Sequence, residues 1–253
     1  MRKKVELDER PTRLKITIET FAKEKIWIKV RDANRINTFY TKRYAFVDGV
    51  EEFFVLMPQA PMDALVIVYN DQNGNMRNDQ SFRVNIEPLP LELKQHKFSK
   101  KTTSFIKFAQ EFADECGYLS ASPKGDTYKS NNGRFRIDYF DKIRSYKTNR
   151  VISTPARISQ LNGRIEVSAE QFRKMTIPMR MAILLHEYSH YYLNTNPSDE
   201  SQADLNGLNI YLKLGYPRID IYNVFLNVFK RSPSKENKKR FEKLDRFVKK
   251  NKR

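Results

Sequence analysis

Cysteine, glycine and histidine are scarce in this chain, which has 1, 8 and 3 of them among 253 residues. Cys116 has no second cysteine to pair with, so an internal disulfide is excluded and a reducing compartment is favoured. No stretch of about eighteen residues is continuously apolar, so we expect no membrane span. Residues 1–10 are not followed by an apolar segment, so we expect no secretory signal. A cytoplasmic location is the resulting expectation.

Acidic residues are also too few to balance the basic ones. The chain has 47 Lys and Arg against 30 Asp and Glu, a formal net charge of +17. Such an excess favours an anionic partner, which could be nucleic acid, an acidic protein surface or anionic lipid. No nucleic-acid-binding motif, Walker loop, G-x-S-x-G pattern or cysteine nucleophile arrangement is present, so a solvated lysine-rich surface stays open as the alternative.

The front part of the chain has the periodicity of strands. Apolar residues alternate with polar ones over residues 14–18, 26–30 and 81–86, and turn signals such as Asn73-Gly74 separate the apolar segments. Six or seven short strands of this kind predict an antiparallel β-sandwich domain over residues 1–93. The polar stretch at residues 94–101 is predicted to be a linker.

The period changes after this linker. Phe105, Phe108 and Phe112 lie at helical spacing, and Asn162-Gly163 predicts a hairpin between short strands near 151–160 and 164–167. Helices are then expected to the end of the chain, the first ending near residue 193 and the next capped by Ser198. Residues 102–253 therefore predict an α+β domain, and the whole chain an α+β fold.

The most informative stretch is the H-E-x-x-H pattern His186-Glu187-Tyr188-Ser189-His190. On a helix, side chains four residues apart lie on one face, so His186 and His190 can bind one cation. Glu187 leaves the same turn and can reach a water bound to that cation. Because histidine is so scarce here, the expected number of chance matches is on the order of 10⁻².

A second block, E-S-Q-A-D at residues 200–204, follows this pattern closely. Zinc sites that perform chemistry use three protein ligands and keep a fourth position open. Glu200 would complete such a set with His186 and His190. Asp204 lies one helical turn after Glu200 and is the candidate for orienting a ligand histidine.

These residues predict a peptidase reaction. Zinc lowers the pKa of bound water to about 7, and Glu187 would take a proton from that water and pass it to the leaving amine. The reaction also needs a group that stabilises the oxyanion. The sequence leaves five candidates for it: Tyr211, Tyr216, Tyr222, Arg218 and His96.

The stretch L-L-H-E-Y-S-H-Y-Y at residues 184–192, followed by E-x-x-A-D at residues 200–204, resembles the gluzincin metallopeptidases. The short gap between the two blocks is similar to that of ImmA/IrrE-type proteases. The continuation to L-G-Y-P at residues 214–217 is similar to the HtpX-like group. The resemblance covers roughly residues 100 to 250 and implies a zincin-like fold there. It implies a soluble zinc-dependent endopeptidase acting on a protein or peptide.

The resemblance also implies roles for individual residues. Zinc would be bound by His186, His190 and Glu200, with Glu187 as the catalytic base and Asp204 as an orienting residue.

A strand near 151–160 or 164–168 would form the upper rim of the cleft, where a substrate could pair as an extra strand. The chain lacks the membrane helices of the HtpX-like group and the helix-turn-helix domain of some ImmA/IrrE proteins. Its β-rich front half matches neither group. These departures bear on the substrate more than on the metal.

Two other interpretations stay open. His186 and His190 could be core histidines without a metal, although a buried Glu187 between them would be costly without a cation. The chain could also be a structural or assembly protein, such as a phage virion component, whose zincin-like fold has little or no proteolytic activity. Under the peptidase interpretation, the β-domain would recruit the target or anchor the enzyme in a larger assembly.

Three weaker signals are assigned to ordinary structure. Residues 71–79 resemble the start of a calcium loop but lack its final glutamate, so a plain hairpin is expected. Trp27, the single tryptophan, lies in a predicted strand and is expected in the core. The basic segment 235–253 is expected to be an amphipathic helix that packs its apolar side on the domain, with an anionic-partner surface as the alternative.

Overall fold

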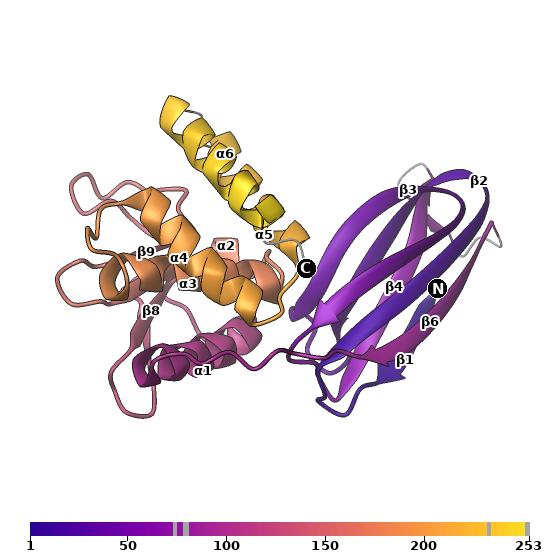
Figure 1. Ribbon diagram of the computed structural model, residues 1–253, viewed down its shortest axis with the longest axis horizontal. Coiled ribbons are helices and arrows are strands. Elements are labelled where there is room, and N and C mark those ends of the chain that lie inside the picture. The colour runs from indigo at the N-terminus through magenta and orange to yellow at the C-terminus, as the bar shows by residue number, and fades with distance from the viewer. Residues whose placement is uncertain (73–74, 78–80, 232–233, 251–253) are drawn as a thin grey trace. The chain divides into compact units, whose positions relative to one another are not determined.

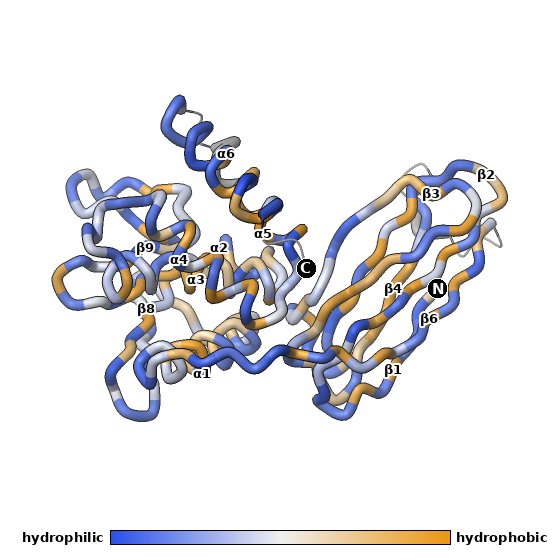
Figure 2. Tube along the Cα trace, viewed as in Figure 1, coloured by the Kyte–Doolittle hydropathy of each residue, from blue (hydrophilic) through white to orange (hydrophobic). Residues whose placement is uncertain are grey.

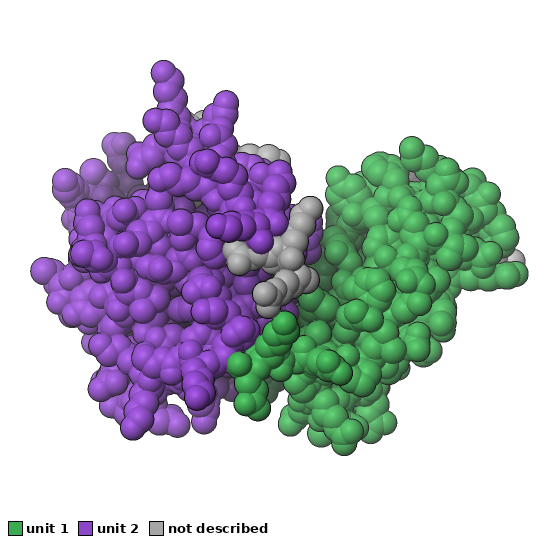
Figure 3. Space-filling view, in the orientation of Figure 1, with its two compact units in different colours: residues 1–95 green, residues 96–253 purple. Residues whose placement is uncertain are grey.

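The computed structural model describes residues 1–72, 75–77, 81–231 and 234–250. They divide into two compact units, Met1–Gln95 and His96–Arg253, coloured separately in Figure 3. The first unit is an antiparallel sheet, and the second mixes helices with a small sheet, so the chain is α+β (Figure 1). Within the described residues, no helix is both long and apolar enough to cross a membrane.

The first unit is built around one long hairpin. Its strands are β1 (Arg2–Glu6), β2 (Thr12–Asp32), β3 (Phe39–Met57), β4 (Asp63–Gln72), β5 (Asn75–Arg77) and β6 (Phe82–Pro90). β2 pairs with β3 along most of its length, with β6 over its first half and with β4 over its second half. β1 and β5 both pair with β4, so the described strands form a single antiparallel six-stranded sheet.

The two segments of alternating pattern near residues 14–18 and 26–30 belong to one strand, β2. An irregularity in its pairing with β3, between Thr20 and Glu24, separates the two halves. Because residues two apart share a face, the even-numbered side chains of both halves point inward, and the alternation is visible along β2 in Figure 2. Six of them have no exposed surface: Leu14, Ile16, Ile18, Ile26, Ile28 and Val30.

Trp27 does not belong to this core, so that prediction is wrong. Its neighbours Ile26 and Ile28 point inward, and Trp27 lies half-buried on the opposite face of the sheet. Residues 73–74 and 78–80 lie outside the described residues. The predicted Asn73-Gly74 turn and much of the calcium-like stretch fall there.

The second unit places helices against a four-stranded sheet. Its sheet has the order β7-β8-β10-β9, in which β8 and β10 are parallel and the outer pairings are antiparallel. The elements are α1 (Lys100–Glu115), β7 (Asp126–Lys129), β8 (Arg136–Phe140), β9 (Ala156–Ile158), β10 (Ile165–Ser168), α2 (Ala169–Phe172), α3 (Ile177–Tyr192), α4 (Glu200–Lys213), α5 (Arg218–Arg231) and α6 (Lys235–Lys250). α1 begins inside the span predicted as linker.

The expected hairpin is confirmed. β9 pairs antiparallel with β10, and the intervening Gly163 has φ +69°, a conformation that favours glycine. β9 is the edge strand of this sheet, whereas β10 is paired on both sides.

Aromatic packing fixes α3 against α1. The ring of Tyr188 stacks on Phe105 with centroids 4.2 Å apart, and its hydroxyl lies 3.1 Å from that of Thr102. The guanidinium of Arg180 is fully buried and donates to the carbonyls of Phe172 and Ala113. These contacts hold the helix that carries the H-E-x-x-H residues.

Candidate metal site

α3 turns two imidazoles toward one point. The helix begins after Thr176, whose hydroxyl accepts from the Met179 backbone N–H, and Pro178 occupies its first turn. His186 and His190 follow one turn apart, and their Nε2 atoms lie 3.0 Å from each other. The two rings are nearly perpendicular, with centroids 4.6 Å apart.

α4 supplies a carboxylate to the same point. Asp199, rather than the expected Ser198, caps this helix by accepting from the backbone N–H of Gln202. Glu200 is therefore the first helical residue. Its Oε2 lies 3.5 Å from Nε2 of His186, and its Oε1 lies 3.6 Å from Nε2 of His190. The ligand atoms of these three residues lie within 4.8 Å of one another, a group that could hold a metal ion.

The three donors lie close enough together to contact one small cation. Bonds of about 2.0–2.1 Å at tetrahedral angles place neighbouring ligand atoms about 3.3 Å apart. The two Nε2 atoms lie 3.0 Å apart, and each lies 3.5 or 3.6 Å from a different oxygen of Glu200. Two imidazoles and one carboxylate are also a donor set that zinc accepts. These three residues could therefore hold a metal ion.

The outer ring nitrogens are held by oxygen atoms. Nδ1 of His190 lies 2.7 Å from the carbonyl oxygen of Pro197, which can only accept, so Nδ1 carries the proton. Nδ1 of His186 is buried and lies 2.9 Å from Oδ1 of Asp204, off the line of a regular hydrogen bond. Both Nε2 atoms face the centre, 3.0 Å apart, so either a proton on one of them or a cation between them must relieve the repulsion of their lone pairs.

Arg240 is the residue that the sequence did not single out. From α6, its Nε and Nη2 donate to Asp204 at 2.8 and 2.9 Å, and Nη2 also lies 2.9 Å from Oε2 of Glu200. Its side chain is only 11% exposed although it belongs to a basic segment. The sequence did hold a signal for its burial. Arg240 lies one and two helical turns before Leu244 and Val248, on the same face of α6, and both of these are buried.

These contacts shift the proton affinities of the cluster. Burial lowers the pKa of His186, but the contacts with Asp204 and Glu200 outweigh burial and raise this pKa to about 10. Burial raises the pKa values of Glu200 and Asp204, but their contacts with His186 outweigh it and hold both below their ordinary values. A metal ligand must be deprotonated, so a cation bound here would replace the proton on His186.

Glu187 is placed differently from the three ligand candidates. It is buried, which raises the pKa of its carboxyl, and it accepts a hydrogen bond from the backbone N–H of Ile158 on β9. Its carboxyl lies in the same cavity as His186 and His190. Burial makes the carboxylate more ready to take up a proton, which is what a general base requires.

A cavity of about 490 Å³ opens over the cluster. One wall is the edge strand β9 and the residues around it, so the strand near 151–160, and not β10, forms the rim. Arg240 also lines this cavity. The five residues considered for the oxyanion are absent from the described lining; Tyr211, for example, donates to the Pro217 carbonyl. These five are Tyr211, Tyr216, Tyr222, Arg218 and His96.

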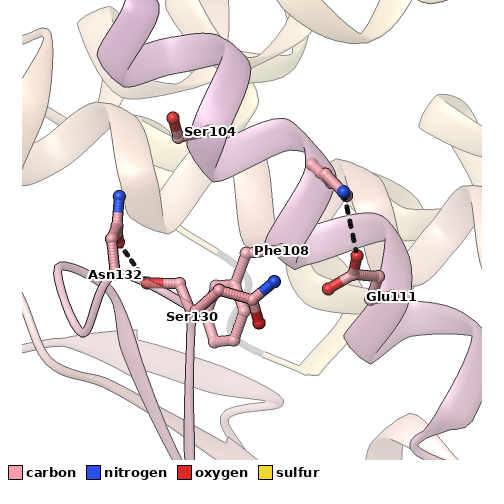
Figure 4. A pocket seen from close by; sticks show the side chains of 7 residues that line it. Ser104, Phe108, Glu111, Ser130 and Asn132 are labelled. Atoms are coloured by element: carbon pink, nitrogen blue, oxygen red, sulfur yellow. Dashed lines mark hydrogen bonds and ion pairs between the residues drawn. The ribbon is translucent and has the colours of Figure 1, made fainter.

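A second hollow, of about 150 Å³, lies beside α1 (Figure 4). It is lined by Ser104, Phe108, Glu111, Ser130 and Asn132, among others. Its polar groups are engaged with neighbours: Lys107 pairs with Glu111, and Ser130 donates to Asn132. No convergent donor set is formed by these described residues, so the hollow offers no comparable chemistry.

No family model matches the chain, and neither a curated protein nor a solved structure matches it.

Proposed function

We propose that this protein is a zinc-dependent endopeptidase of gluzincin type, whose second unit is a zincin-like domain and whose first unit is a β-sandwich. The observation that carries the proposal is the convergence of His186, His190 and Glu200, whose ligand atoms lie within 4.8 Å of one another, with Glu187 in the same cavity. Zinc held by the three residues would polarise a peptide carbonyl and make a water molecule a better nucleophile.

The chain's own groups supply the remaining steps. An extended peptide would lie along the edge strand β9, which has a pairing partner on one side only. Glu187 would take a proton from the attacking water at its carboxylate and deliver it to the nitrogen of the leaving amine. In the described cavity lining, Arg240 is the cation nearest to the ligand carboxylate of Glu200. We therefore propose Arg240, in place of the five earlier candidates, as the group that stabilises the oxyanion.

The decisive experiment combines metal analysis with Glu187→Gln. Purified protein is expected to hold close to one zinc ion per chain and to cleave an unfolded protein or a peptide library. Glu187→Gln should keep the zinc and lower cleavage by about 10²- to 10⁴-fold, because only the proton acceptor is removed. Glu170→Gln, at an exposed glutamate on α2, is the matched control and should cleave normally.

Two outcomes would overturn the proposal. Absence of bound metal would remove the site itself. Zinc retained without cleavage by the unmodified protein would favour the structural or virion-assembly role, because the fold would then keep its ion without the reaction.

A further inference from the structure

The second half of β2, with the parts of β3 and β4 that pair with it, forms one region of the first unit's sheet. The outer face of this region carries aromatic and basic side chains at paired positions. Tyr69 on β4, Trp27 on β2 and Tyr44 on β3 lie directly opposite one another across three adjacent strands. Along β3 the next residue on this face is Phe46, which is paired with Lys25. We call this region the aromatic face, and it consists of Trp27, Tyr44, Phe46, Tyr69, Lys25, Lys29 and Lys42.

The rings of the aromatic face contact one another; Tyr44 and Phe46 are exposed, and Trp27 and Tyr69 are half-buried. Trp27 stacks on Tyr69 with centroids 6.2 Å apart and planes 9° apart, and its centroid is 5.2 Å from that of Tyr44. Tyr44 is 52% exposed and Phe46 is 58% exposed. Large apolar groups exposed together in this way mark an interaction surface more often than isolated ones do.

Lysines surround these rings. The ammonium of Lys25 lies 4.6 Å from the ring centroid of Tyr44, and that of Lys29 lies 4.8 Å from the centroid of Tyr69. Lys42 is paired with Lys29 across the strands. The rows through Lys25, Trp27 and Lys29 hold eight paired positions of this face, 25, 27, 29, 42, 44, 46, 67 and 69, and none of them is an aspartate or glutamate; the next position of this parity on β4 is Asp71. Most of the chain's basic excess lies in residues 96–253, so the first unit as a whole is close to neutral. The lysines of the aromatic face are therefore a local cluster of positive charge.

Cation–π pairing alone could hold Lys25 and Lys29 in place on an ordinary solvated surface. Lys23 likewise lies 5.9 Å from the ring centroid of Phe46, yet these pairs leave both Tyr44 and Phe46 more than half exposed. An acidic protein partner would satisfy the lysines but would make little use of four neighbouring rings. A nucleic acid duplex would satisfy the lysines too, but its paired bases are not free to stack on side chains.

We propose that the aromatic face binds single-stranded nucleic acid, with bases stacked on Trp27, Tyr44 and Phe46 and phosphates contacted by Lys25, Lys29 and Lys42. Bases stack on exposed aromatic rings of sheet surfaces in several single-strand-binding domains, and a surrounding basic groove follows the phosphates. Stacking tolerates any base, so binding depends little on sequence. The proposal concerns the first unit and does not depend on the peptidase activity.

The test uses the full-length protein and a fluorescein-labelled oligothymidylate of about 16 nucleotides, within the range that single-strand-binding folds cover. Fluorescence anisotropy at low salt should show saturable binding, and the emission of Trp27 should be quenched as bases stack on it. Tyr44→Ala and Phe46→Ala should each weaken binding about fivefold or more. Lys25→Gln with Lys29→Gln should lower the salt dependence by about 0.7 per lysine in log–log slope.

Phe54→Ala is the matched control. Phe54 is 39% exposed and lies 4.8 Å from the guanidinium of Arg13, so it is a similar cation–ring pair on the other half of the hairpin. Its loss should leave binding unchanged, and circular dichroism should show that every variant is folded.

Three results would overturn the proposal: no binding at low salt, equal displacement of the probe by polyglutamate, or binding lost only when Lys243 and Arg246 of α6 are replaced by glutamine.

Discussion

At the scale of single residues, the site depends on groups that need not touch the metal. Asp204 contacts Nδ1 of His186 and also receives two hydrogen bonds from Arg240. Asp204 therefore fixes the ring of His186 and neutralises Arg240, which lies beside Glu200. Asparagine has nearly the same shape as aspartate, so replacing Asp204 by asparagine should weaken its contacts with His186 and Arg240 without creating a cavity.

Asp204→Asn is expected to lower zinc affinity by about 10- to 100-fold, the usual cost of losing an outer partner of a ligand histidine. Competition with a chromophoric chelator measures this affinity directly. Asp141→Asn, at an exposed aspartate of the same unit, controls for the loss of one negative charge. Equal affinities in the two variants would mean that Asp204 does not support the site.

At the scale of elements, the ligand set depends on the close approach of α3 and α4. Gly207 makes this approach possible. A Cβ atom at this position would lie 2.9 Å from the backbone nitrogen of His186 and 3.0 Å from the carbonyl carbon of Leu185. These are backbone atoms, so they can give way only if one helix shifts. A shift of that kind would separate Glu200 from the two imidazoles.

Gly207→Ala is therefore expected to lower both the free energy of unfolding and the zinc affinity. The sign is informative, because alanine in a helix interior is otherwise favoured over glycine by about 1 kcal/mol. Urea unfolding and chelator competition measure the two quantities. Asn209→Ala, on the exposed side of α4, should be neutral or slightly stabilising. A stabilised Gly207→Ala protein would show that this contact does not set the distance between α3 and α4.

Elements with strong local signals were predictable, and elements set by distant partners were not. The hairpin at Asn162-Gly163 follows from turn chemistry that acts over a few residues. Arg240 was missed because its partners Asp204 and Glu200 lie 36 and 40 residues earlier in the chain. Trp27 was assigned to the wrong face because its large apolar side chain was weighed above the parity of Ile26, Ile28 and Val30, which places residue 27 on the opposite face.

At the scale of the whole molecule, two single residues report on separate units. Trp27, the only tryptophan, lies in the first unit. Cys116, the only cysteine, lies in the second, where it ends α1. Its side chain is fully buried, and this burial raises the pKa of the thiol. The thiol should therefore resist alkylation until the second unit opens.

Removing the metal should destabilise the second unit selectively, because the proposed ligands come from two helices of that unit and a bound ion stabilises only the folded form. With zinc present at about 100 times its dissociation constant, the stabilisation is about 2.7 kcal/mol. In urea, chelation should move the onset of Cys116 alkylation to lower concentration and leave the Trp27 fluorescence transition in place. His190→Ala should behave like the chelated protein with or without chelator. An alkylation curve indifferent to the chelator would place the metal elsewhere, and equal movement of both transitions would show that the two units unfold together.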